Sequence, residues 1–217
     1  MATRSASGTI SPAQPRTIQY DHAAIENMYR RRAVRSFKGE RLDEFTIRRL
    51  LDAAVQAPTA VHAEPWAFVV VQDALLLKRL SDRSKAMALE AAAEHHALLK
   101  APGAAPAGDL AALLANPEFN VFYNAGTLIV ICARPLGQFV TADCWLAAGN
   151  LMLAACAMGL GTCCIGLSVP VLNVPEVKQE LGIPPEVAAV APIIAGIPAG
   201  PVARVSRKAP EILRWMH

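Results

Sequence analysis

The chain has 217 residues, of which 53% are apolar, and a net charge of +3. This composition supports a sizeable core and excludes an intrinsically disordered protein. Two local basic clusters, within residues 30–35 and 204–208, stand out rather than one wide basic surface, which argues against nucleic acid as a partner. Residues 1–20 lack the apolar core of a signal peptide. We expect a flexible leader over 1–20 and a single domain over 21–217.

The first half of the chain predicts three helices and one strand. The second helix is the clearest, because Asp43 is a good N-cap, Ile47 and Leu50 follow helical spacing, and Pro58 requires the helix to end before it. The expected elements are a helix over 21–30, the capped helix after 43, a strand over 67–72, a helix over 73–100 and a loop over 101–109.

The second half predicts three strands around a long apolar helix. This helix, residues 140–161, is long enough to span a bilayer. It contains Asp143 and Asn150 and has no flanking Lys or Arg, so we favour a buried helix of a core or dimer interface and no membrane contact. The other expected elements are strands over 126–133, 162–168 and 187–198, and a short helix that Asn173 and Pro175 begin and that Gly182 and Pro184 close.

The cysteines indicate a reduced protein. Their number is odd, no CxxC pair occurs, and no histidine has the spacing of a metal ligand beside them. We therefore expect reduced core thiols, no metal and a cytoplasmic location. The cysteines are Cys132, Cys144, Cys156, Cys163 and Cys164.

A basic cluster follows the first predicted helix. If the segment is extended, Arg31 and Arg35 share one side; if it is helical, Arg31, Arg32 and Arg35 do. Both geometries bring guanidinium groups together, as a phosphate monoester requires. A solvated charge run at a helix end is the alternative. The chain contains no G-x-x-x-x-G-K loop, no G-x-G-x-x-G loop and no serine elbow, so no other phosphate loop or Ser-His-Asp site competes.

A polar corner leads directly into the first strand. "APTAVHAEPW" holds two prolines, His62 and Glu64, and "AFVVVQ" follows it. Polar side chains beside apolar backbone indicate either a structural corner or the edge of a ligand pocket.

Four motifs in order resemble the FMN-dependent nitroreductase family. They are "YRRRAVRSF", "LLDAAVQAPTAVHAEPWAFVVV", "NLMLAACAMGLGTCCIG" and "SRKAPEILRW", and they cover nearly all of residues 21–217. The resemblance implies an α+β fold with a mixed central β-sheet wrapped by helices. It also implies a homodimer with FMN at the interface, so that 21–217 would form one nitroreductase-like FMN-binding domain.

The resemblance also implies the cofactor site. Basic positions would hold the FMN phosphate and the flavin edge, the corner of the other protomer would lie against the flavin, and a backbone stretch would face the ring near N5. Family members often have Ser where this chain has Ala33, and Asn and Gln where it has His62 and Glu64. The implied cofactor-binding residues are Arg31, Arg32, Ala33, Arg35, Arg207 and Lys208; Pro58, Thr59, Ala60 and His62; and Cys164, Ile165 and Gly166.

The implied activity is hydride transfer from NADH or NADPH through flavin N5 to a nitroaromatic, quinone or similar acceptor, by a ping-pong mechanism. Flavin carries the chemistry, which explains why few acid or base side chains stand out. Arg32 is a candidate for stabilising the reduced flavin. A reductive dehalogenase or flavin-consuming enzyme with residues 101–125 as a lid is one alternative, and a non-catalytic flavin-binding protein is another.

Overall fold

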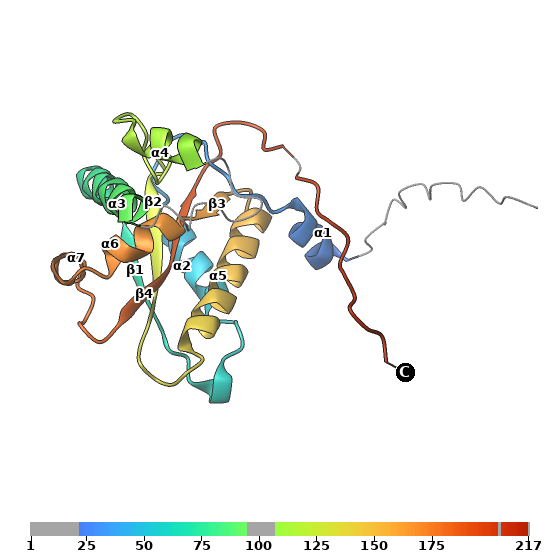
Figure 1. Ribbon diagram of the computed structural model, residues 1–217. Helices are drawn as coiled ribbons and strands as arrows, with labels where there is room; N and C mark the ends of the chain where they lie inside the picture. Colours follow the sequence, from blue (N-terminus) through green and yellow to red (C-terminus); the bar gives the residue numbers. More distant parts are fainter. Residues whose placement is uncertain (1–21, 95–106, 204, 217) are drawn as a thin grey trace, which may run out of the picture.

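A four-stranded sheet forms the centre of the fold (Figure 1). The computed structural model describes residues 22–94, 107–203 and 205–216. Strands lie in the order β1-β2-β4-β3, and each neighbouring pair is antiparallel. A parallel bridge joins Ala33 to Thr162 in β3. The strands are β1 (Trp66–Val71), β2 (Thr127–Ala133), β3 (Gly161–Cys164) and β4 (Ala188–Gly196).

The two central strands divide the interior into two cores. Every residue of β2 is buried, as expected for a continuous apolar run covered on both faces. Because side chains alternate along a strand, Ile129 and Ile131 enter one core while Leu128 and Val130 enter the other. The predicted α+β fold, with helices around a central sheet, is confirmed. The sheet was expected to be mixed; among the described residues its strand pairs are antiparallel, and the parallel contact is the isolated bridge at Ala33.

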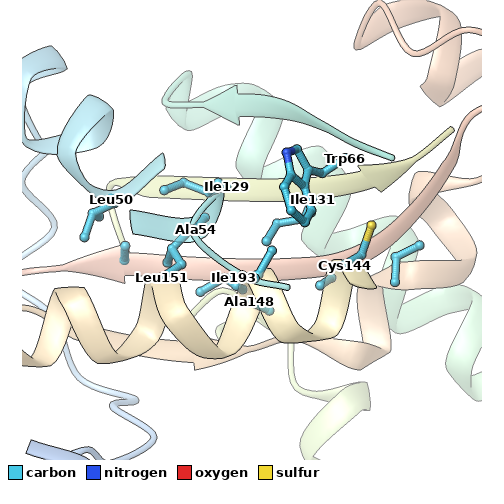
Figure 2. Close-up of a cluster of buried hydrophobic side chains, with 14 of the residues drawn as sticks. Leu50, Ala54, Trp66, Ile129, Ile131, Cys144, Ala148, Leu151 and Ile193 are labelled. Carbon is cyan, nitrogen blue, oxygen red and sulfur yellow. The ribbon is translucent and has the colours of Figure 1, made fainter. Parts of the chain in front are cut away.

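The first core lies between the sheet and helices α2 (Glu44–Ala54) and α5 (Val140–Ala157). Asp43 caps α2 as predicted, because its side chain accepts a hydrogen bond from the Thr46 amide at 2.8 Å. Figure 2 shows Leu50 of α2 and Leu151 of α5 beside Ile129 of the sheet. Trp66, at the start of β1, is buried in the same core.

The second core lies on the opposite face of the sheet, under α3 and α6 (Figure 1). Its largest fully buried side chain is Phe122, which packs with Leu80 of α3 and Leu172 of α6. The helices not yet placed are α1 (Ala23–Arg30), α3 (Ala74–Glu94), α4 (Ala107–Ala115), α6 (Val169–Leu172) and α7 (Pro175–Glu180).

Several predicted boundaries need correction. Helix α4 begins inside the predicted loop 101–109, and the unpredicted α6 has four residues, too few to show a period. Helix α5 stops at Ala157, because Gly159 adopts a left-handed φ of 75° soon afterwards. Strand β3 ends at Cys164, and Gly166–Ser168 form a 3-10 turn. The predicted leader over 1–20, residues 95–100 of the third predicted helix and residues 101–106 of the loop lie outside the described residues.

Helix α5 is the one helix among the described residues that is long and apolar enough to cross a membrane, with a mean hydropathy of 1.4. One side of it fills the first core with Cys144, Ala148 and Leu151. It is therefore a core helix of the folded domain. Its other side leaves Trp145 and Leu146 exposed.

Candidate functional site

The arginine segment lies along the edge of the sheet. The Val34 amide donates to the Thr162 carbonyl at 2.9 Å, next to the bridge between Ala33 and Thr162. Gly161 permits this approach, since a Cβ there would lie 2.7 Å from a Val34 methyl carbon. The segment is thus extended, which decides between the two predicted geometries. Val34 points into the protein, and Arg31 and Arg35 share the other side at period two.

A cavity of about 240 Å³ joins Arg35 to the end of β3. The guanidinium carbon of Arg35 lies 6.0 Å from the centre of the Tyr123 ring, an arrangement that orients the cation. The structure therefore brings Arg35 together with the predicted stretch after β3. The lining residues are Arg35, Leu110, Leu113, Leu114, Phe119, Val121, Tyr123, Cys163, Cys164, Ile165, Gly166 and Leu167.

The charge in this cavity is positive. Burial raises the pKa of the Cys163 and Cys164 thiols, and Arg31 opposes the shift at both sulfurs, joined by Arg35 at Cys163. The thiols therefore stay neutral at physiological pH. Within the described residues, neither Arg31 nor Arg35 forms an ion pair. Two guanidinium groups are thus available to an anionic ligand.

Arg32 behaves differently from its neighbours. Its Nη1 donates to the carbonyl oxygens of Tyr29 at 2.5 Å and of Arg31 at 2.7 Å. The side chain thus turns back onto the C-terminal end of α1, where a cation is favourable. Its buried Nε has no hydrogen-bond partner among the described residues.

The polar corner is strained and is held by one buried carboxylate. Val61, His62 and Glu64 have left-handed φ values of 47°, 57° and 43°, which are unfavourable for residues other than glycine. His62 Nε2 lies 3.4 Å from Glu64 Oε1. Asp143, in the first turn of α5, is only 4% exposed, and its Oδ1 accepts a hydrogen bond from the Ala60 amide at 3.2 Å.

Helix α5 separates the corner from the arginine cavity within one chain. The corner is bound to the first turn of α5, whereas β3 begins shortly after its last turn. Eighteen helical residues span about 27 Å. The chain therefore does not bring Pro58, Thr59, Ala60 and His62 to its own Arg35. That separation is compatible with the prediction that the corner serves the other protomer.

The C-terminal tail begins beside the arginine segment. The Ala199 amide donates to the Ser36 carbonyl at 3.0 Å, and residues 33–36 and 199–203 line a cavity of about 410 Å³. Beyond it the tail leaves the domain and ends away from the sheet (Figure 1). Arg207 and Lys208 are exposed in this tail. Their predicted part in the site stays a prediction.

The sequence did not predict that two residues, Asp143 and Tyr123, support the candidate site. Asp143 attracted notice only as a polar residue in an apolar helix, and Tyr123, which packs against Arg35, carried no sequence signal. Tyr123 and Asn124 both have left-handed φ values, 52° and 56°.

The structure is thus an α+β protein with an extended basic segment at the edge of a helix-wrapped sheet. The chain belongs to the Nitroreductase family, whose model matches residues 28–197. It is 26% identical over 179 residues to an Archaeoglobus fulgidus protein provisionally named NADH dehydrogenase/NAD(P)H nitroreductase, covering 80% of this chain and 84% of that protein.

Solved structures share the fold. A nitroreductase from Bacteroides fragilis with bound FMN superposes with a TM-score of 0.72 at 23% identity, covering 90% of this chain and 100% of that one. An FMN-dependent nitroreductase from Clostridium difficile R20291 gives a TM-score of 0.69 at 25% identity, with the same coverage.

Asp143→Ala should loosen the corner, because it leaves the Ala60 amide without its acceptor. We expect a loss of about 1 to 3 kcal/mol in the free energy of unfolding, measured by urea denaturation, and faster hydrogen exchange at the Ala60 amide. Asp143→Asn retains an acceptor oxygen, so it should restore part of the free energy of unfolding and part of the exchange protection at Ala60. The exposed Asp52→Ala on α2 is the matched control. An unchanged exchange rate at Ala60 in Asp143→Ala would contradict this role.

Proposed function

We propose that the protein is an FMN-dependent oxidoreductase that transfers hydride from NADH or NADPH to an organic acceptor such as a nitroaromatic or a quinone. The observation that carries the proposal is the cavity where Arg35, with Arg31 close by, meets residues 163–166. Support for FMN comes from the Clostridium difficile structure, and support for NAD(P)H from the Archaeoglobus fulgidus protein.

The residues of the cavity fit a flavin mononucleotide. Arg31 and Arg35 offer unpaired guanidinium forks that match phosphate oxygens. At Gly166 no atom stands within 4 Å of the place that a Cβ would take, so backbone is accessible to a flat ring. Ala33 contributes only backbone in this scheme. Arg207 and Lys208 would approach the phosphate from the tail, which starts beside residues 33–36.

When bound, FMN supplies hydride acceptance and donation at N5; the protein binds, orients and stabilises charge. The backbone of Cys164, Ile165 and Gly166 would face the ring. Arg32 is less available to stabilise a reduced, anionic flavin than the sequence suggested, because its guanidinium already donates to two carbonyl oxygens. No side-chain acid or base is required beyond these contacts.

Our proposal includes a homodimer in which the corner of the partner closes the cavity. Helix α5 exposes Trp145 and Leu146, α1 exposes Met28, and the tail exposes Leu213. Large apolar side chains gathered on one protomer favour burial by a second copy. The five free cysteines favour a reducing, cytoplasmic location, and the shared sheet supports residues 21–217 as one domain.

Arg35→Ala and Arg31→Ala should each weaken FMN binding about ten- to a hundredfold, because each removes a charge-assisted hydrogen bond. Arg207→Ala should weaken it in the same direction. Quenching of flavin fluorescence on titration of apoprotein, at one fixed salt concentration, measures the affinity. Arg48→Ala, on the exposed side of α2, is the matched control. Wild-type affinity in Arg35→Ala would overturn the assignment of this cavity to the cofactor.

Trp145→Glu should convert the dimer to a monomer and reduce FMN binding, since a charge would then face the apolar surface of the partner. Multi-angle light scattering at micromolar concentration gives the mass, and flavin absorbance gives the occupancy. Leu75→Glu, at an exposed position of α3, should leave the mass and the FMN occupancy unchanged. A wild-type monomer that retains FMN would refute the shared site.

Turnover should follow a ping-pong scheme, because nicotinamide and acceptor must use the same face of the flavin in turn. NADPH should bleach the flavin absorbance on anaerobic mixing, and a nitro or quinone acceptor should restore it. Initial rates at varied donor and acceptor should give parallel double-reciprocal lines. Intersecting lines would contradict the scheme, and absence of bleaching with both NADH and NADPH would contradict the proposed activity itself.

A further inference from the structure

A second cavity, of about 530 Å³, lies between α3 and α4. We call it the α3–α4 cavity. It continues the arginine cavity, because Leu110, Leu114, Gly166 and Leu167 line both. A ligand beside Gly166 therefore lies next to the space between the two helices. The volume lies within the usual range for small-molecule sites.

The described residues that line the α3–α4 cavity are all apolar. Helix α3 contributes Met87, Ala88 and Leu89, α4 contributes leucines and an alanine, and Pro170 closes one side. None of the eleven described lining residues has a side chain that can form a normal hydrogen bond or carry a charge. A charged group placed here would lose its hydration without compensation. The cavity therefore selects uncharged, apolar groups.

The two connected cavities thus differ in charge. Arg35 lines the first cavity, where it is compatible with a polar reacting group and an anionic cofactor. The described side chains of the second cavity are apolar. This arrangement matches a ligand with a polar reactive head and an apolar substituent. It does not match an aryl amino acid, whose ammonium and carboxylate both require partners.

We propose that the α3–α4 cavity binds an uncharged apolar substituent of the electron acceptor. The preferred acceptors are therefore nitroaromatics or quinones that carry an alkyl chain or a second ring, rather than zwitterionic aryl amino acids. This inference rests on the proposed function, because it places the acceptor beside the flavin. It names the acceptor class that the same site takes.

A series of 4-alkylnitrobenzenes tests the proposal with purified, FMN-loaded protein and NADPH. Each turnover oxidises one NADPH and, with a proton from solvent, reduces the nitro group to a nitroso group and water. From methyl to n-butyl, kcat/KM should rise about fourfold per methylene, as apolar burial predicts. 3-Iodo-L-tyrosine should be turned over at least a hundredfold less efficiently than the butyl compound. A series without chain-length dependence, or efficient turnover of the amino acid, would overturn the proposal.

Ala88→Leu is the informative variant, because it fills the cavity from α3. It should lower kcat/KM for the butyl compound at least tenfold and leave unsubstituted nitrobenzene within about twofold, as overpacking of a filled site predicts. Ala86→Leu, at an exposed position of the same helix, should keep the wild-type dependence of kcat/KM on chain length. Equal FMN affinity and equal bleaching by NADPH in both variants show that the fold and the first half-reaction are intact. If both variants give the same series, the cavity is not the site.

Binding of Nile red, a neutral apolar dye, separates this proposal from the proposed function. Its saturable fluorescence should appear with wild type and Ala86→Leu, and its affinity should fall at least tenfold in Ala88→Leu, with or without FMN. If NADPH fails to bleach the flavin but the dye discriminates between the variants, the activity is wrong and the apolar site stands. If bleaching is normal and neither dye nor acceptor discriminates, the apolar site is wrong and the activity stands.

Discussion

The close contact between Val34 and Gly161 is the constraint on which the site depends. A side chain at position 161 would collide with Val34, so glycine there lets the arginine segment approach the edge of β3. The amide of Val34 then binds the Thr162 carbonyl and fixes the register. With Val34 buried, period two turns Arg31 and Arg35 outward beside the residues that follow β3. One glycine thus determines where the positive charge of the site stands.

The elements that depend on local sequence patterns were predicted correctly. Asp43, Ile47 and Leu50 form the cap and stripe of α2 as expected, and all strands were located. The geometry of residues 31–35 could not be decided locally, because the bond from Val34 to Thr162 joins residues far apart in the chain. Helix α4 was missed for a different reason. Its first three residues lie in the Gly- and Pro-containing stretch 101–109 that was read as a loop, although the Ala and Leu residues that follow have high helix propensity.

The candidate site was predicted in composition but not in detail. The family resemblance named Arg31, Arg32 and Arg35 together, and only the structure separates them. Arg32 binds backbone carbonyls at the end of α1, whereas Arg35 packs on Tyr123 and faces the cavity. This division arises from side-chain directions, which the sequence of residues 31–35 does not reveal. The apolar cavity next to it also escaped prediction, because its two walls come from separate helices.

The strained corner gives the strongest physical argument for a second copy of the chain. Val61 is β-branched, has a left-handed φ and is 97% exposed, so within one chain it has strain without burial to offset it. Such strain amounts to about 1 to 3 kcal/mol for a residue, and it persists only where surrounding contacts impose it. Here the bond from Ala60 to the buried Asp143 imposes it from α5. An exposed apolar side chain held outward at such a cost agrees with the proposed homodimer, in which a second copy would cover it, and the length of α5 agrees with a role for the corner at the cavity of that second copy.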